Sequence, residues 1–268
     1  MKANDTTRRA GRTRRPTRLR AAAGTTVATA CLALVAGAGR AQAATVYVPT
    51  NQPTIQAGID AAGDTGTVYV EPGTYTGEGN RAIDFGGMNV SLISTGGAAV
   101  TTIDCDGADR AFFFHSGEDT TSLVEGFTIR EGTGDYGGAV RCQGSSPLFR
   151  SCIFFLNEAT AGGGALHANS TSGPRLEDCT LHYNSAQSGG AVYMDGAQGW
   201  ARNCTFKSNS ATHRGGAAYL RWMAETAFED CTFSRNTAGL DGGGVYSVDA
   251  ESPFDLCVFV GNEAPSGG

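Results

Sequence analysis

The chain has 268 residues, of which 40% are hydrophobic, 17% are charged and 39 are glycine. So much glycine excludes a helical bundle, because each interior glycine costs a helix about 1 kcal/mol relative to alanine, and the absence of a Gly-X-Y period excludes collagen. Low charge and regularly spaced apolar residues argue against disorder, so a turn-rich, mostly β protein remains.

The net charge of −6 is unevenly distributed along the chain. Residues 1–43 contain nine basic residues and one acidic residue, which leaves 11 basic and 25 acidic residues in 44–268. An acidic body of this kind repels nucleic acid and anionic membranes. We therefore expect neither as a partner.

Residues 1–43 have the order of a secretory signal peptide. A basic stretch ends at Arg20, a mildly apolar run follows over 21–39, and Ala41-Gln42-Ala43 forms a small-residue cleavage site. The strongly apolar part, 27–38, is too short for a membrane span of about 20 residues. The sequence predicts export with cleavage after Ala43 and no membrane span afterwards, and it leaves the Sec and Tat routes open.

The segment after the signal peptide contains one helical and one strand-like pattern. In Pro53-Thr-Ile-Gln-Ala-Gly-Ile-Asp-Ala-Ala62, Ile55 and Ile59 have the i,i+4 spacing of an amphipathic helix, and Val68-Tyr-Val-Glu-Pro-Gly-Thr-Tyr75 follows. Both segments resemble the start of pectin-lyase-like β-helices, in which a short helix caps the open end of the stack. We expect residues 44–123 to form this cap and the first coils.

A run of aspartates offers the one candidate metal site. Asp104-Cys-Asp106-Gly-Ala-Asp109 resembles part of a calcium loop, although the longer ligand series and terminal Glu of an EF-hand are missing. Calcium is the only cofactor that the sequence suggests, and we otherwise assign no metal and no cofactor. The four histidines fall at unrelated repeat positions, so we assign no catalytic triad and no catalytic residue.

Five cysteine-anchored segments repeat in phase along the second half of the chain. They are Cys152-Ile-Phe-Phe-Leu-Asn157, Cys179-Thr-Leu-His-Tyr-Asn184, Cys204-Thr-Phe-Lys-Ser-Asn209, Cys231-Thr-Phe-Ser-Arg-Asn236 and Cys257-Val-Phe-Val-Gly-Asn262. The spacings are 27, 25, 27 and 26 residues, and each Asn precedes an alanine and, in the complete repeats, a pair of glycines. An earlier coil keeps this frame from Phe127 to Val140 without the Cys and Asn.

A unit of this length with short β-rich runs cannot bury its own apolar face, whereas stacked coils can, each adding about 4.8 Å. The leucine-rich repeat has a similar period, but its L-x-x-L-x-L signature and repeated helix are absent. The sequence predicts an all-β fold, a right-handed parallel β-helix of about 26-residue coils with a short N-terminal capping helix.

In this register each repeat position has one environment. We expect the cysteine, the residue three before it and the residue two after it to point inward, and the asparagines to form an amide ladder. The cysteines lack C-x-x-C spacing, so buried structural thiols are favoured over zinc ligands. The position two before the cysteine alternates mostly between Glu and Arg, which indicates a surface charge ladder rather than paired catalytic carboxylates.

The F-x-x-N and GGA-[IVL] pairs over residues 124–268 resemble the repeats of chlamydial-type polymorphic outer membrane proteins. We therefore expect regular β-helix repeats over 124–268. Because Gly267-Gly268 stop within a repeat, we expect the repeat region to be truncated at its C-terminus. The resemblance implies a secreted or cell-surface protein, and association with the outer membrane is among the locations that it allows.

The residue after each glycine-pair motif forms one outward column that is a candidate binding stripe. Its members are Arg141, His167, Tyr193, Tyr219 and Tyr246. Stacked tyrosines that stabilise the sheet explain this column more simply, at about 0.5–1.5 kcal/mol per aromatic pair. The functional alternative is a ledge for sugar rings or a surface protein.

Two functions follow from these patterns. The first is a non-enzymatic, exported adhesin or envelope binding module with a carbohydrate or surface-protein partner. The second is a pectin-lyase-like polysaccharide lyase or glycoside hydrolase acting on acidic polysaccharide, which rests on the resemblance in fold alone. The motifs of pectin methylesterases and polygalacturonases are absent, and we favour the first.

Overall fold

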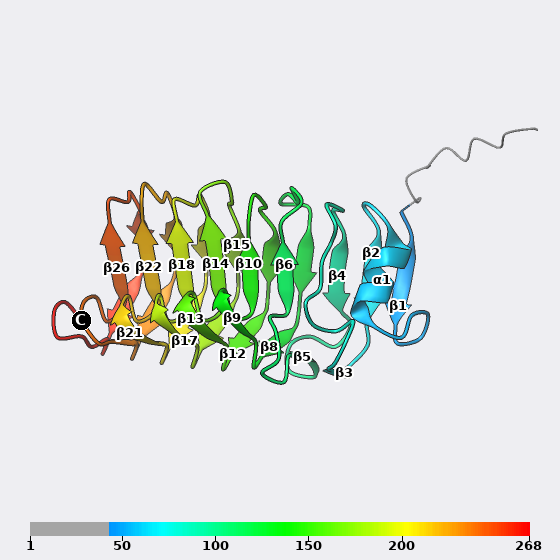
Figure 1. Cartoon of the computed structure of the whole chain (residues 1–268), viewed down its shortest axis with the longest axis horizontal. Coiled ribbons are helices and arrows are strands. Elements are labelled where there is room, and N and C mark those ends of the chain that lie inside the picture. The colour runs from blue at the N-terminus through cyan, green and yellow to red at the C-terminus, as the bar shows by residue number, and fades with distance from the viewer. Residues whose placement is uncertain (1–42) are drawn as a thin grey trace, which may run out of the picture. The chain divides into compact units, whose positions relative to one another are not determined.

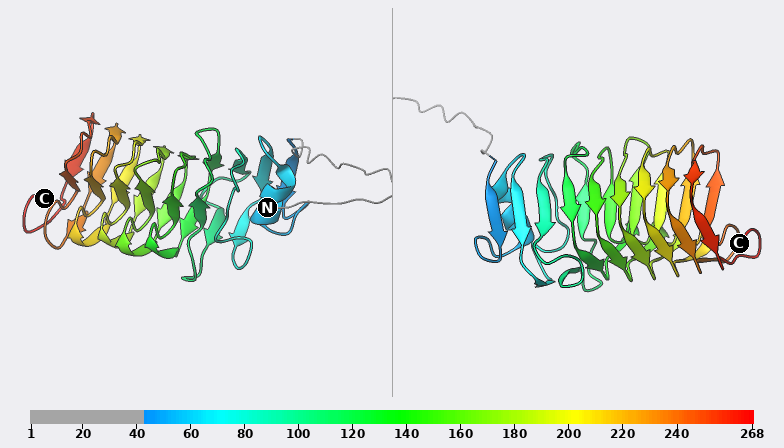
Figure 2. Two further views of the ribbon diagram at one scale, coloured as in Figure 1. Left: turned by 45° about the horizontal axis from the view of Figure 1, so that its top comes forward. Right: turned by 180° about the vertical axis from the view of Figure 1, so that it is seen from behind.

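The computed structural model describes residues 43–268, which belong to one compact unit. The predicted signal peptide, apart from Ala43, lies outside the described residues. The described chain winds into a parallel β-helix whose coils stack along one axis (Figures 1 and 2). Each regular coil runs in turn through four sheets, which we name A, B, D and C. The predicted all-β solenoid is confirmed.

The strands are short and fall into these four sheets. Sheet A comprises β1 (Thr45–Val48), β2 (Thr67–Val70), β4 (Ser91–Ser94), β7 (Leu123–Glu125), β11 (Leu148–Arg150), β15 (Arg175–Glu177), β19 (Trp200–Arg202), β23 (Ala227–Glu229) and β27 (Phe254–Asp255). Sheet B comprises β3 (Gly73–Tyr75), β5 (Thr101–Asp104), β8 (Thr128–Arg130), β12 (Ile153–Phe155), β16 (Thr180–His182), β20 (Thr205–Lys207), β24 (Thr232–Ser234) and β28 (Val258–Val260).

The other two sheets begin later in the chain. Sheet D comprises β9 (Thr133–Tyr136), β13 (Glu158–Gly162), β17 (Ser185–Ser188), β21 (Ser210–Arg214) and β25 (Thr237–Ala238). Sheet C comprises β6 (Phe112–Phe114), β10 (Val140–Cys142), β14 (Leu166–Asn169), β18 (Val192–Asp195), β22 (Ala218–Arg221) and β26 (Val245–Val248).

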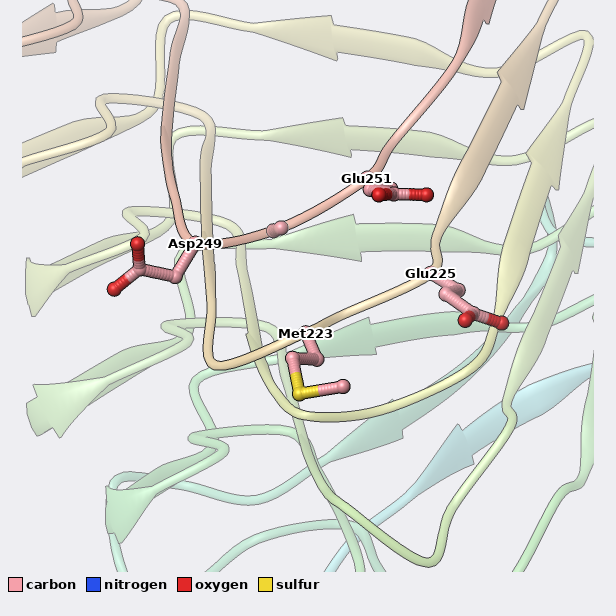
Figure 3. Close-up of a pocket in the computed structure, with 5 residues that line it drawn as sticks. Met223, Glu225, Asp249 and Glu251 are labelled. Carbon is pink, nitrogen blue, oxygen red and sulfur yellow. The ribbon is translucent and has the colours of Figure 1, made fainter.

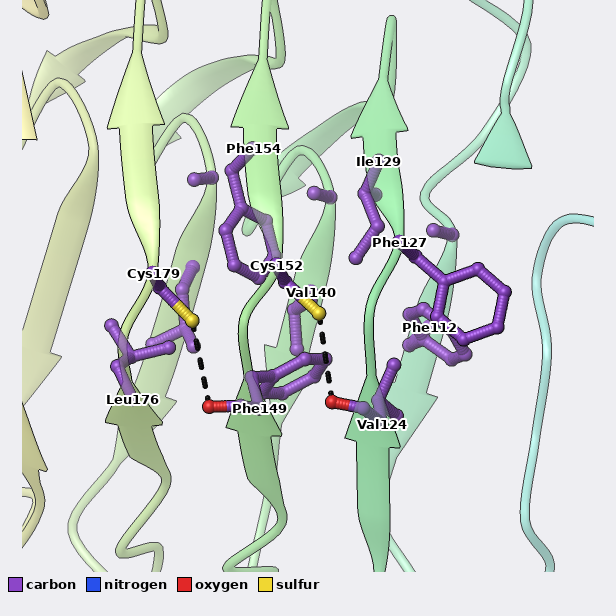
Figure 4. Packing of buried hydrophobic residues seen from close by; sticks show 14 of the residues in the cluster. Phe112, Val124, Phe127, Ile129, Val140, Phe149, Cys152, Phe154, Leu176 and Cys179 are labelled. Carbon is purple, nitrogen blue, oxygen red and sulfur yellow. Dashed lines mark hydrogen bonds between the residues drawn. The ribbon is translucent and has the colours of Figure 1, made fainter. Parts of the chain in front are cut away.

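The core is built from the inward columns that the repeats predict. Phe149, Cys152 and Phe154 of one coil are each 0% exposed, and their counterparts in the two neighbouring coils lie on either side of them (Figure 4). Phe206 and Phe233 stack with ring centres 4.7 Å apart and an interplanar angle of 5°. Only in the last coil are the inward side chains, such as Phe259 at 46%, substantially exposed.

All seven cysteines of the described chain are free thiols, and six of them are buried. The Sγ of Cys152 donates to the carbonyl of Val124 at 3.5 Å, and Cys179 donates likewise to Phe149 (Figure 4). Burial, together with nearby Asp104, raises the pKa of Cys105 to about 12, so this thiol stays protonated and unreactive at neutral pH. The six buried cysteines therefore contribute to the packing of the core.

The predicted asparagine ladder is present, and its members in four successive coils are 0% exposed. Asn184 Nδ2 donates to Asn209 Oδ1 at 3.0 Å and to the carbonyl of Phe154 at 3.1 Å. The backbone N–H of Asn184 also donates to Asn209 Oδ1, at 3.0 Å. Each amide thus satisfies buried backbone groups at the corner between sheets B and D as well as its neighbour in the ladder.

The glycine pairs form the corner between sheets D and C, and the two glycines of a pair are required for different reasons. Gly163 has φ of +68°, a left-handed conformation that favours glycine. Gly164 needs no such angle, but a Cβ there would lie 2.3 Å from the carbonyl oxygen of Gly190 in the next coil. The repeated Gly-Gly motif therefore combines a sharp turn with close approach of neighbouring coils.

The predicted capping helix is α1 (Ile55–Ala62). Thr54 is its N-cap and accepts a hydrogen bond from the N–H of Ala57 at 3.3 Å, while Ile55 and Ile59 are fully buried. A Cβ on Gly58 would lie about 3 Å from Val48 and Val68, so α1 packs closely on the inward side chains of β1 and β2. The helix covers the apolar N-terminal end of the stack (Figure 1).

Candidate functional site

The five residues of the candidate stripe lie in register along sheet C. Arg141 pairs with His167, His167 with Tyr193, Tyr193 with Tyr219, and Tyr219 with Tyr246. The rings of Tyr193 and Tyr219 are 5.0 Å apart and stacked, and those of Tyr219 and Tyr246 are 5.5 Å apart. The structure therefore brings together all five residues that the sequence singled out.

The middle of this stripe is covered. His167, Tyr193 and Tyr219 are 5%, 4% and 8% exposed, because sheet D folds over them: a Cβ on Gly162 would lie 2.0 Å from the Tyr193 ring. Burial and the charge of Arg141 lower the pKa of His167 to about 4, so this imidazole is neutral at pH 7. The geometry favours a stabilising ladder, and binding along the stripe stays a prediction that is untested.

Arg141 ends the stripe in a charged cluster rather than an open ledge. Arg141 Nη1 and Arg110 Nη2 both contact Asp135 Oδ1, at 3.2 and 3.3 Å. Both guanidinium groups lie near the ring of Phe113, at 5.9 and 5.6 Å. A cavity of about 340 Å³ adjoins this cluster and is lined by Ala82, Asp84, Asp109, Arg110 and Phe113.

The carboxylates of Asp104 and Asp109, two of the three aspartates of the calcium hypothesis, bind different groups. Asp104 Oδ2 accepts from Arg130 Nε at 3.0 Å, and Asp104 Oδ1 accepts from the N–H of Asp106 at 3.0 Å. Asp109 Oδ1 instead accepts from the N–H of Arg110, at 2.7 Å. Within residues 43–268, no group of three or more His, Cys, Asp or Glu side chains is arranged to hold a metal ion. The calcium hypothesis gains no support from this arrangement.

The predicted charge ladder does form on the outer face of sheet A. Arg150 Nε donates to Glu177 at 2.8 Å and Arg150 Nη1 to Glu125 at 3.4 Å, while Arg202 Nε donates to Glu229 at 2.8 Å. These side chains are roughly one quarter to one half exposed. Each pair therefore contributes modestly to stability, at about 0–1 kcal/mol, while fixing the register between coils.

One arrangement was not anticipated from the sequence, which assigned no Ser-His-Asp set. His115 Nε2 lies 3.2 Å from Asp84 Oδ2, and Ser116 Oγ lies 3.3 Å from His115 Nδ1. The histidine and aspartate side chains are 36% and 43% exposed. A catalytic triad relies on a buried carboxylate to orient its histidine, and Asp84 is not one. We assign no catalytic role to this group.

Glu118 is a buried carboxylate that the sequence did not single out. It is 1% exposed and accepts hydrogen bonds from Ser145 Oγ at 2.6 Å and from the N–H groups of Gly87 at 2.9 Å and Ser116 at 3.0 Å. Burial alone raises its pKa, but these hydrogen bonds outweigh burial and leave the pKa below its ordinary value of 4.5. The charged form therefore ties three successive coils together.

We expect Glu118→Gln to lower the free energy of unfolding by about 2 kcal/mol at pH 7, because charge-assisted hydrogen bonds are lost. A lowered folded-state pKa gives stability that is complete above the unfolded-state pKa and is lost as the pH falls through the folded-state pKa. Urea titrations should show the gap between variant and parent closing below about pH 4.5. The exposed Glu251→Gln is the control, and a gap independent of pH would contradict this account.

A cavity of about 500 Å³ near the C-terminal coils has a mostly acidic lining. Its lining residues are Met223, Glu225, Asp249, Ala250 and Glu251. Figure 3 shows Asp249 and Glu251 on one loop and Met223 and Glu225 on the neighbouring loop. This opening is poorly suited to an anionic polysaccharide, because its charged groups would repel the ligand.

A smaller notch, of about 200 Å³, lies beside Trp200 on the outer face of sheet A. It is lined by Trp200, Ala201, Arg202, Ala227 and Glu229. Trp200 belongs to the column four residues before the cysteine, between Arg175 and Ala227. Sequence reasoning compared the columns two and three residues before the cysteine and missed this one, although aligning it would have shown an aromatic ring next to a small residue.

The stacked coils, their cysteine and asparagine columns and their Gly-Gly corners define a β-helix repeat protein. Residues 66–233 match the family described as right handed beta helix region, which is more than half of the chain, so the chain belongs to that family and the predicted fold is confirmed. Residues 230–248 match the Chlamydia polymorphic membrane protein repeat, as the resemblance predicted. A search among curated proteins gave no match. No helix in residues 43–268 is long and apolar enough to cross a membrane.

Proposed function

We propose that this chain is an exported, cell-surface β-helix protein that acts as a non-enzymatic adhesin or envelope binding module. Two features support export to the surface. The first is the signal-peptide order of residues 1–43, and the second is the similarity of its repeats to those of chlamydial polymorphic membrane proteins. Its partner is a carbohydrate or a surface protein.

The observation that carries the non-enzymatic part is a set of six outward carboxylates that form ion pairs with arginines of neighbouring coils. The pairs are Asp104–Arg130, Glu125–Arg150, Glu177–Arg150, Asp195–Arg221, Glu229–Arg202 and Asp241–Arg214. A carboxylate that is hydrogen-bonded to an arginine of the next coil is held in place by that coil, so its oxygen atoms are already engaged and less available to a substrate. These pairs tie neighbouring coils together, which suits a rigid scaffold for presentation and binding.

We expect the purified full chain to release no new reducing ends and no unsaturated products from acidic or neutral polysaccharides, with or without calcium. Circular dichroism on the same sample should show a β-rich, folded protein. N-terminal sequencing of the exported protein should begin at Ala44. Clear turnover would establish the polysaccharide lyase or glycoside hydrolase alternative in place of the binding module.

A further inference from the structure

The two sides of the Trp200 ring have different neighbours. On the side of the preceding coil is Arg175, whose guanidinium carbon lies 5.7 Å from the ring centre. On the side of the following coil the register neighbour is Ala227, which offers only a methyl group. Because Ala227 is too small to cover the indole, this step from Trp to Ala leaves space beside the ring next to Arg202, and the notch occupies that place.

Polar groups of both kinds border the notch. Arg202 Nε donates to Glu229 Oε2 at 2.8 Å, and the two side chains remain 52% and 45% exposed, so each keeps donors or acceptors for a ligand. The Arg202 guanidinium also lies 5.2 Å from the Trp200 ring centre, which holds the indole in place. An exposed proline, Pro253, follows Ala227 in the same column, since Phe228 pairs with Phe254.

These dimensions match a single sugar ring. Neighbouring strands are about 4.8 Å apart, so the backbones bearing Trp200 and Pro253 are separated by about 9.6 Å with Ala227 as the floor between them. A pyranose ring is a flat body with an apolar C–H face and hydroxyl groups around its edge. The apolar face suits the indole, and the hydroxyl groups suit a rim that contains both a guanidinium and a carboxylate.

We propose that the notch formed by Trp200, Ala227, Arg202 and Glu229 binds one pyranose residue of a glycan. The sugar ring stacks on the face of Trp200 that looks toward Ala227, while its hydroxyl groups donate to Glu229 and accept from Arg202. This inference rests on the proposed binding function and assigns it a ligand class and a location, on sheet A and away from the tyrosine stripe of sheet C.

The chain contains two tryptophans, Trp200 and Trp222, which allows a direct optical test. In a Trp222→Phe background, Trp200 is the sole tryptophan, and its fluorescence should change saturably with added sugar. The probes are three trisaccharides, one built of hexose, one of N-acetylhexosamine and one of uronate, and each is titrated into the full chain. A peptide rich in aromatic residues is titrated in the same way and represents a protein ligand, the alternative to a sugar.

Calorimetry on variants then locates the site. Trp200→Ala removes the stacking surface, and Ala227→Leu fills the notch while leaving Trp200 in place; we expect each to weaken binding of the preferred trisaccharide at least tenfold. Trp222→Ala is the matched control, because it changes the other tryptophan, which is 67% exposed, and it should leave the affinity unchanged. Circular dichroism confirms that each variant is folded.

The outcomes separate this site from the broader function. Binding that survives both notch variants, a response to the peptide alone, or no response to any sugar would overturn the sugar site and leave a protein-binding adhesin. Cleavage of the sugar would overturn the non-enzymatic function. In that case a raised KM in Trp200→Ala, with kcat unchanged, would still support the notch.

Discussion

Replacing Asn209 by alanine should lower the free energy of unfolding by about 3 kcal/mol or more, one of the two largest effects expected in this chain. Asn209 Oδ1 accepts from the backbone N–H and the Nδ2 of Asn184, both at 3.0 Å. Its Nδ2 donates to the carbonyl of Leu181 at 2.9 Å and to Asn236 Oδ1 at 3.0 Å. Alanine abolishes these bonds and leaves their partners buried.

The cost is large because water cannot replace the missing amide. The asparagines on both sides are 0% exposed, so their orphaned groups pay a full desolvation penalty. Gln198→Ala is the control, since it removes an exposed amide that bonds only to Glu225 at 3.1 Å, and we expect a change below about 0.5 kcal/mol. Urea denaturation followed by far-UV circular dichroism measures both. Equal stability of the two variants would show that the asparagine ladder does not contribute to the free energy of unfolding.

The asparagine ladder also shows what the sequence alone can establish. Five amides at one repeat position predicted a ladder because identical coils must place identical residues one above another. The inward positions, such as Phe149 and Phe154, followed from the same argument together with the alternation of side chains along a strand. Helix α1 was predictable from Ile55 and Ile59. These features depend on local pattern and stacking, which a sequence displays directly.

The burial of the stripe could not be read in this way. Alternation correctly places Tyr193 and Tyr219 on the outer side of sheet C, but it contains no information on the angle at which sheet D meets sheet C. That angle is set by the Gly163 turn and by the contact of Gly162 with the Tyr193 ring. The outer face of one sheet is therefore covered by the next.

The corner between sheets B and D could not be read from the sequence either. Leu156 and Tyr183 adopt left-handed conformations with φ of +56°, which bulky residues normally avoid. The asparagine that follows each of them is fixed by its hydrogen bonds in the ladder, so tertiary structure overrides local preference. Both side chains are about half exposed, and neither position stands out in the sequence.

Gly190→Ala should be as damaging as loss of an asparagine, with an expected loss of about 3 kcal/mol or more in the free energy of unfolding. A Cβ at Gly190 would lie 2.2 Å from the carbonyl oxygen of Gly216 and 2.6 Å from that of Ser210. Both are backbone atoms of the adjacent coil, so no side-chain rotation relieves the contact. The coils must separate, which weakens the hydrogen bonds from the N–H of Gly190 to Gly215 and from the N–H of Ala191 to Ala217.

Limited proteolysis should also show where along the stack Gly190→Ala weakens the structure. Because each coil contacts only its neighbours, separation at this corner uncouples the coils from Ser210 onward from those before it. We expect limited proteolysis of Gly190→Ala to trim the C-terminal coils first and leave the N-terminal part, including α1, resistant. Gly73→Ala is the matched control, since its Cβ would meet only the Tyr75 ring at 3.6 Å, an ordinary contact. If Gly190→Ala proved as stable and as protease-resistant as this control, close coil contact could not be the reason for the second glycine of each pair.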